Sequence, residues 1–416
     1  MTGPAAYLRF VRKNAAFLSA GLVISFTSSY GQTFFIALFA DRIMAANGLS
    51  DGEWGLIYTV ATTASAVLMV FAGGLTDRMR VRRLMVFAGV GLALACLAMA
   101  TLSGAVVLLL TVLALRFFGQ GLMSHIAAVA MARWFVASRG KALSIAAMGF
   151  ALGQAVLPLV FVALLAVAEW RMLWALSAVL VLLTLPLVLR LLRAERTPQA
   201  LATERPAPGL GGLHWTRSAV LRHWLFWLML PLLLGPPAFG TALFFHQVHL
   251  TAVKGWAMID YVALLPLLTV VSVATTFASG ALIDRVGTGP LIALYMLPFA
   301  GSFMMMGSAE TLGMAALALL IFGLGMGTQA TVPTAFWAEY FGTRHLGSIK
   351  ALAVAIMVFG SAVGPGLTGV LIDAGYDFDA QMPWIGVYFL LAAGLATLGV
   401  VRARTTLPAK VDVVGS

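Results

Sequence analysis

One six-residue motif occurs twice in this chain, at a separation of 207 positions. Residues 73–78 read GGLTDR, and residues 280–285 read GALIDR. Three further pairs of residues share the same separation: Gly140 with Gly347, Gly153 with Gly360, and Pro158 with Pro365. Four such pairs rarely arise by chance in a chain with only 16 prolines. The repeat therefore predicts a duplicated unit and a fold made of two equivalent halves.

The amino-acid composition places both halves in a lipid environment. Hydrophobic residues make up 61% of the 416 residues and charged residues only 10%, whereas a soluble domain has about 25% charged residues. The one cysteine, Cys96, excludes a disulfide within the chain, and no Cys/His spacing typical of zinc occurs. We expect no metal site and no cofactor. No HExxH or P-loop motif is present, and the sequence does not predict an enzyme.

Twelve apolar stretches are long enough to cross a membrane, which takes roughly 20 residues. We therefore expect an all-α membrane protein with twelve transmembrane helices in two pseudo-symmetric six-helix bundles. The predicted spans are 15–41, 53–75, 84–103, 105–132, 141–168, 171–192, 222–249, 258–282, 288–308, 311–338, 346–372 and 382–402. The predicted domains are an N-terminal bundle (1–192), a cytoplasmic linker rich in Pro and Gly (193–221) and a C-terminal bundle (222–416).

The distribution of charge predicts the orientation in the membrane. With the N-terminus in the cytoplasm, 21 of the 26 Lys and Arg residues fall in cytoplasmic segments and 3 in external ones. Both termini are therefore expected in the cytoplasm, and the net charge of +11 is assigned to topology rather than to nucleic-acid binding. Arg outnumbers Lys 21 to 5, which suits a GC-rich bacterial genome and an inner (plasma) membrane.

The segment 73–83, GGLTDRMRVRR, resembles the loop signature between helices 2 and 3 of the major facilitator superfamily. The second copy follows predicted helix 8, as the repeat of that family requires. The chain departs from the family pattern at Arg80, where Gly is usual, and at Val81, where a basic residue is usual. The resemblance implies a secondary transporter that works by alternating access.

The repeated acidic and basic pair has two interpretations. Asp77 can accept hydrogen bonds from backbone amides at a helix N-terminus and pair with a neighbouring Arg, which would latch one conformation. Alternatively, Asp77 and Arg78 are solvated loop charges. The second copy, Asp284 and Arg285, favours the latch. Predicted helices 5 and 11 each contain glycine and proline at which the helices either pack closely or bend during gating. These residues are Gly153 and Pro158 in helix 5, and Gly364 and Pro365 in helix 11.

The deepest charge in the predicted helices is a guanidinium. Arg116 lies near the middle of the fourth span, with Gln120 one turn later on the same face. A buried charge is costly in hydrocarbon and tends to face a wet cavity or a partner. Because no Asp or Glu falls at mid-depth, Arg116 favours an anionic substrate over a cationic one; the alternative is a structural pairing.

Other polar and aromatic residues are candidates for the same cavity. Helices 1, 4, 7 and 10 line the cavity in the family that the chain resembles. The candidate lining residues are Tyr30, Thr33, Arg116, Gln120, Phe245, His246, Gln329 and Trp337. Phe245 and Trp337 could equally face lipid or the core. Lys350 is either a second cationic site or a side chain that reaches the cytoplasmic surface. His246 and His249 either carry a transported proton or lie at the membrane interface.

A narrower resemblance concerns the substrate. Residues 347–350, GSIK, followed by residues 360–365, GSAVGP, look like the monocarboxylate and oxalate–formate branch, although residues 261–282 lack the Arg expected there. The chain is thus predicted to be a monomeric carrier of a small organic anion, by proton symport or anion exchange. Its predicted partners are this small-molecule substrate, protons and the lipid bilayer. The alternatives are an efflux carrier of amphipathic compounds, for which the 20 Met residues would be adaptable, and a sensor without transport.

Overall fold

The structure is a computed structural model that describes residues 4–72, 75, 79–135, 139–193, 208–342 and 344–405. Every regular element among these residues is a helix. The chain forms two compact units. The first unit contains Met1–Ala202, Leu243–Pro266 and Pro365–Gly375. The second contains Thr203–Ala242, Leu267–Gly364 and Tyr376–Ser416.

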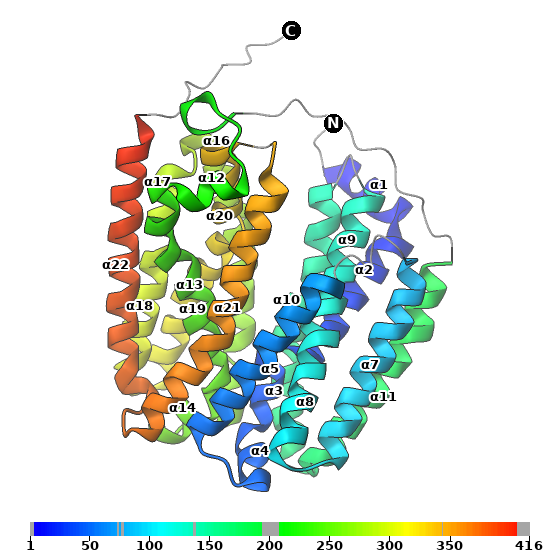
Figure 1. Cartoon of the computed structure of the whole chain (residues 1–416). Coiled ribbons are helices and arrows are strands. Elements are labelled where there is room, and N and C mark those ends of the chain that lie inside the picture. The colour runs from blue at the N-terminus through cyan, green and yellow to red at the C-terminus, as the bar shows by residue number, and fades with distance from the viewer. Residues whose placement is uncertain are drawn as a thin grey trace. The chain divides into compact units, whose positions relative to one another are not determined.

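The first unit contains the helices of the N-terminal half, shown in blue to green in Figure 1. They are α1 (Pro4–Lys13), α2 (Ala15–Thr27), η1 (Ser28–Gly31), α3 (Thr33–Ile36), η2 (Ala37–Phe39), α4 (Ala40–Asn47), α5 (Asp51–Ala72), α7 (Val81–Thr101), α8 (Ala105–Leu115), η3 (Arg116–Met123), α9 (Ser124–Trp134), α10 (Arg139–Leu165) and α11 (Trp170–Leu191). It also contains α14 (Gln247–Lys254) and α15 (Met258–Val262). Within this unit α7 packs along α11, and α2 packs along α10.

The second unit contains most of the remaining helices. They are η5 (Leu210–Gly212), α12 (Arg217–Arg222), α13 (Trp224–Phe245), α16 (Leu265–Val286), α17 (Gly289–Leu294), α18 (Met296–Gly307), α19 (Leu312–Gln329), α20 (Val332–Phe341), α21 (Leu346–Asp373) and α22 (Phe378–Arg404). Here α18 packs along both α22 and α19. The last residues of α13, the first of α16 and the last of α21 belong to the first unit.

Ten helical stretches among the described residues are long and apolar enough to span a membrane, and a bent pair, Ala15–Gly31 with Thr33–Asn47, forms one more. The 22-residue helix α5 corresponds to the remaining predicted span, 53–75. Large apolar side chains lie exposed on the outside of these helices, including Phe71, Val106, Val270 and Trp384. Such apolar surface is stable in lipid rather than in water.

Glycines bring equivalent helix pairs close together in the two halves. A Cβ atom on Gly149 would clash with the carbonyl oxygen of Leu22, so α10 touches the backbone of α2. A Cβ on Gly364 would likewise clash with the carbonyl oxygen of Ala238, between α21 and α13. Small residues at a helix interface permit this approach in a membrane.

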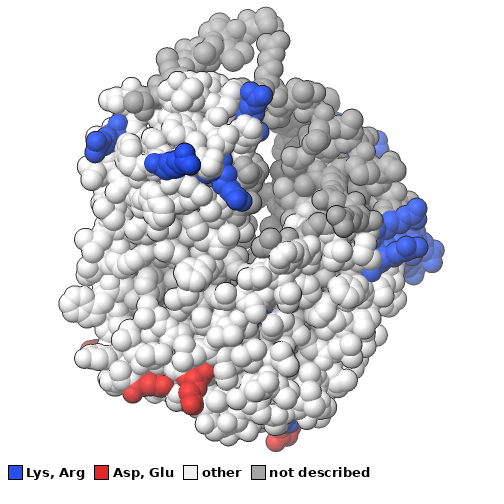
Figure 2. Space-filling model, viewed as in Figure 1, with Lys and Arg blue, Asp and Glu red and all other residues white. Residues whose placement is uncertain are grey.

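Charges separate along the helices. Helix α22 has Asp379 in its first turn and Arg402 and Arg404 in its last, and α5 begins with Asp51 and Glu53. On the face that Figure 2 shows, basic and acidic side chains gather in separate places. We call the acidic end the outer end, as the charge distribution predicts.

The predicted linker is not wholly irregular. Residues 194–207 lie outside the described part, but the linker's later residues form η5 and α12. The Trp215 ring packs against Phe341 and His223, and its Nε1 donates to the Leu210 carbonyl oxygen. The aromatic contact holds this part of the linker on the second unit.

Candidate anion-binding site

The first span is broken where the predicted cavity lies. Helix α2 gives way to the 3-10 turn η1, Gln32 is extended (ψ 153°), and the two parts of the span differ in direction by 49°. The side chains of Thr27 and Ser28 donate to the carbonyl oxygens of Val23 and Ser25, a pattern that bends helices. At the break, the amide of Phe35 donates to Gln32 and not to Gly31. The Gly31 carbonyl oxygen is therefore available to another partner.

That partner comes from the fourth span, which approaches very closely. A Cβ on Gly31 would clash with the carbonyl oxygen of Leu115, and one on Gly119 would lie 2.6 Å from the Gly31 Cα. The fourth span adopts a π-helical segment here, η3, which begins at Arg116. Segments of this kind are frequent at functional sites, because the extra residue per turn redirects side chains.

Arg116 is buried at this contact, with 1% of its surface exposed. Its Nη1 donates to the Gly31 carbonyl oxygen and to Thr33 Oγ1, both at 3.2 Å. Its guanidinium lies over the Tyr58 ring, 5.2 Å from the centroid, and the Tyr58 hydroxyl shares a hydrogen bond with Thr33. We call Gly31, Thr33, Tyr58 and Arg116 the arginine site.

One edge of the guanidinium has no protein partner within the described ranges. Among the residues that the structure describes, neither Nε nor Nη2 of Arg116 has a hydrogen-bond acceptor. These two nitrogens form one side of the planar fork, which matches both oxygens of a carboxylate. A buried donor without an acceptor is costly, so this edge is suited to receive an anion.

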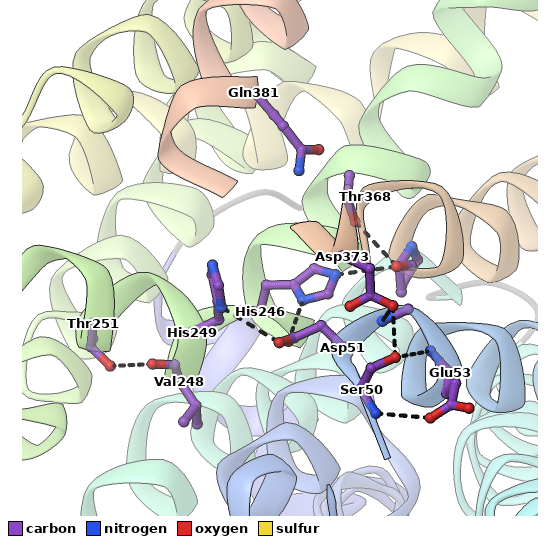
Figure 3. Close-up of polar contacts among 12 residues, drawn as sticks. Ser50, Asp51, Glu53, His246, Val248, His249, Thr251, Thr368, Asp373 and Gln381 are labelled. Atoms are coloured by element: carbon purple, nitrogen blue, oxygen red, sulfur yellow. Dashed lines mark hydrogen bonds and ion pairs between the residues drawn. The ribbon is translucent and has the colours of Figure 1, made fainter. Parts of the chain in front are cut away.

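A second polar cluster lies at the outer end of α5 (Figure 3). His246 Nδ1 lies 3.8 Å from Asp51 Oδ1, and His249 Nδ1 lies 3.6 Å from Asp51 Oδ2. His246 Nε2 lies 3.1 Å from the Pro365 carbonyl oxygen. Asp373 accepts from Ser50 Oγ at 2.6 Å and from the amide of Gly52 at 3.1 Å. We call Asp51, His246, His249, Pro365 and Asp373 the outer cluster.

One face of α5 joins the two clusters. Asp51, Trp54 and Tyr58 are spaced i, i+3 and i+7, so they lie on one side of the helix. Trp54 stacks on Phe245 at 5.4 Å, and the Tyr58 ring lies 4.7 Å from Phe245. Phe245 directly precedes His246. Packed side chains thus run without a gap from the outer cluster to Arg116.

The structure brings together four of the predicted lining residues. Arg116 and Thr33 belong to the arginine site, the Phe245 ring contacts Tyr58 of that site, and the His246 ring lies edge-on to Phe245. Tyr30 is buried instead in an aromatic cluster, edge-on to Phe35 and Phe161. Gln120 is half-buried in η3.

The other predicted lining residues belong to the second unit. Trp337 is buried and stacks on Phe341 within α20. Gln329, the last residue of α19, and Lys350, in the second turn of α21, are half-buried. Lys350 lies two residues before the apolar span that begins at Leu352.

The predicted gating residues are only partly described. Asp77 and Arg78 lie outside the described residues, and so does the side chain of Asp284, whereas Arg285 is exposed at the end of α16. A Cβ on Gly153 would clash with Ser29 Oγ, so this glycine holds α10 against η1. Pro158 and Pro365 lie inside α10 and α21. Gly364 holds α21 against α13, as described above.

Two functional candidates were missed from the sequence. Tyr58 sits in an apolar span with no charged residue beside it, and Asp51 reads as a residue of an external loop. The i, i+3, i+7 spacing of Asp51, Trp54 and Tyr58 is the signal that could have identified them.

An apolar groove of about 740 Å³ lies elsewhere, between α7 and α8. Its lining includes Phe87, Leu94, Leu110 and Phe118, and Thr111 is its only polar residue. None of the described residues that line it is charged, so it suits lipid chains rather than a polar substrate.

Comparison with known proteins agrees with this architecture. The sequence profile described as Major Facilitator Superfamily matches residues 21–365. No curated protein sequence matches the chain. The fold is similar to that of a bacterial homologue of the human lysosomal transporter Spinster, in an inward-facing and unoccupied conformation (TM-score 0.71, 17% identity, covering 95% of this chain and 99% of that one).

Two other solved transporters share the fold. The D-xylose-proton symporter has a TM-score of 0.71 at 15% identity, covering 94% of this chain and 98% of its own. The nucleoside transporter NupG has a TM-score of 0.69 at 12% identity, covering 94% of this chain and all of its own. The expected fold class, an all-α protein with twelve transmembrane helices in two bundles, is confirmed. The chain belongs to the major facilitator superfamily.

Proposed function

We propose that this transporter carries a small organic anion, in particular a monocarboxylate, by proton symport or anion exchange. The observation that carries the proposal is the unused edge of the Arg116 guanidinium. A carboxylate there would accept two parallel hydrogen bonds from Nε and Nη2, while Nη1 stays bound to Gly31 and Thr33.

The surroundings of Arg116 support this role over a structural pairing. Within the described part of the chain, no carboxylate lies at ion-pair distance from the guanidinium, so its charge is balanced only by dipoles and the Tyr58 ring. Bringing an anion to a desolvated cation is strongly favourable compared with leaving the cation alone. The site therefore favours a negatively charged cargo over neutral cargoes such as the xylose and nucleosides of the two similar transporters.

The remaining parts of the proposal concern the rest of the chain. Gln120 and Lys350 are proposed as further polar contacts, and the Asp77–Arg78 and Asp284–Arg285 pairs as conformational latches. The three-part domain organisation, the bacterial inner membrane, the cytoplasmic termini and the monomeric state belong to the same proposal.

Substitution of Arg116 tests the anion site. Purified protein in proteoliposomes would be assayed for uptake of labelled formate, acetate, lactate and oxalate. Arg116→Lys keeps the charge but loses the fork, so we expect half-saturation at a roughly 10-fold higher concentration; Arg116→Ala should abolish uptake. The matched control is Arg171→Lys, which alters an Arg that binds Ala100, Leu102 and Ser103 at the outer end.

The same assay distinguishes anion transport from the alternative function, efflux of amphipathic compounds. Uptake by Arg116→Lys equal to that of the unaltered protein would refute the anion site. If no monocarboxylate is transported, and overexpression instead protects cells from amphipathic drugs, the chain is an efflux carrier. Melting temperatures of the variants would distinguish lost binding from lost folding.

A further inference from the structure

The His246 imidazole faces two hydrogen-bond acceptors. A carbonyl oxygen can only accept, so Nε2 must donate to Pro365. On the other side of the ring, Nδ1 faces a carboxylate oxygen of Asp51. A neutral imidazole carries one N–H, so donation from Nε2 would turn the Nδ1 lone pair toward a negative charge. Only the doubly protonated ring suits both neighbours.

Burial strengthens the requirement that both ring nitrogens of His246 carry a proton. His246 is 2% exposed, so water does not easily replace either contact. Its neighbours also carry net negative charge. The groups that face the cluster are Asp51 and Glu53 on α5, His249 on α14, Asp373 on α21, and Asp41 and Arg42 on α4.

The carboxylate partner stays ionised at physiological pH. Asp51 lies just before the predicted span 53–75, and its contacts with His246 and then His249 hold the pKa of its carboxyl below the usual range. A lowered carboxyl pKa contributes stability above the usual carboxyl range and loses it as pH falls through the lowered value. The negative charge that faces His246 Nδ1 is therefore present near neutral pH.

We infer that His246 is the proton-binding site of the carrier, and that its protonation holds the ends of α13 and α21 against the outer end of α5. The proton sits on Nδ1 when the contact is made. It is released when α5 separates from these two segments, because Nδ1 then loses the Asp51 carboxylate, whereas Nε2 keeps the Pro365 carbonyl oxygen on α21.

The position of α5 connects this step to the cargo. Movement of Asp51 away from His246 would also move Trp54 and Tyr58, which are on the same helical face. Tyr58 positions Thr33 and lies beneath Arg116. Proton binding and the geometry of the arginine site would thus change together, which is the coupling that symport needs. This step rests on the proposed function, whereas proton binding by the outer cluster does not.

The test measures the contact without any substrate. Nitroxide labels would be placed at Ala46→Cys and Ala252→Cys, both exposed on α4 and α14, in a Cys96→Ala background. Electron double-resonance spectra of the full chain in lipid would be recorded from about pH 5.5 to 8.5. We expect a short-distance population at low pH. The ratio of the short-distance to the long-distance population should fall as pH rises. The fall should not exceed about tenfold per pH unit, because a single bound proton sets that limit.

Two variants decide the assignment. His246→Gln retains an amide N–H donor but cannot titrate, so the pH dependence should disappear; His125→Gln, on α9, should leave it intact. A pH dependence that persists in His246→Gln, or is missing from the unaltered protein, would overturn the inference. Monocarboxylate uptake is not part of this readout, so failure of the anion proposal would leave the result standing.

Discussion

Tyr58 is the residue on which the arginine site and the α5 face both depend. Its ring lies beneath the guanidinium and against Phe245, while its hydroxyl bonds to Thr33. The two functions of the side chain can be separated, because Phe keeps the ring and Leu removes it.

We predict that Tyr58→Phe weakens anion binding by roughly 3- to 10-fold, the effect of one neutral hydrogen bond. Tyr58→Leu should weaken it further, because the cation–π contact contributes about 0.5–2 kcal/mol. The measurement is the concentration of lactate or acetate at half-maximal uptake. Equal effects of the two substitutions would show that the ring does not support the guanidinium.

At the scale of elements, the close approach of α10 to α2 is fixed by glycine. Gly149 leaves no space for a methyl group beside the Leu22 carbonyl oxygen, whereas Gly394 in α22 has no atom within 4 Å of an added Cβ. Alanine is the better helix former by about 1 kcal/mol, so the two positions should respond with opposite signs.

We therefore predict that Gly149→Ala lowers the melting temperature of the purified protein and that Gly394→Ala keeps or raises it. Overpacking costs roughly 1–3 kcal/mol, which exceeds the gain in helix propensity. Thermal unfolding in detergent measures both. A Gly149→Ala protein as stable as the Gly394→Ala protein would mean that α2 and α10 separate more readily than their contact indicates.

The elements also show how far sequence alone can reach. The twelve spans were predictable because the length of an apolar stretch is a local property set by membrane thickness. The break at Gln32 was not, because residues 15–41 read as one continuous span. The π-helical segment at Arg116 and the contact between Asp51 and His246 depend on segments distant in the chain. Arg116 itself was identifiable because a lone charge in an apolar span is conspicuous.

At the scale of the whole molecule, the charge distribution is the strongest predictor of the orientation of the chain in a membrane. Basic residues end α11 and α22, and acidic residues begin α5 and α22. Two exposed positions toward each end allow this to be tested in both halves. The outer pair is Ala46 and Ser308, and the inner pair is Arg193 and Thr405.

We predict that a membrane-impermeant maleimide labels Ala46→Cys and Ser308→Cys on intact cells but reaches Arg193→Cys and Thr405→Cys only after permeabilisation. The physical reason is that arginines near span ends are retained on the cytoplasmic side during insertion. Each cysteine would be introduced singly into a Cys96→Ala background. This background lacks the buried native thiol, so the introduced cysteine is the one that reacts. Labelling of the inner pair on intact cells would show that the chain has the opposite orientation in the membrane. His246 would then lie on the cytoplasmic side, and its proton would be exchanged with the cytoplasm rather than with the exterior.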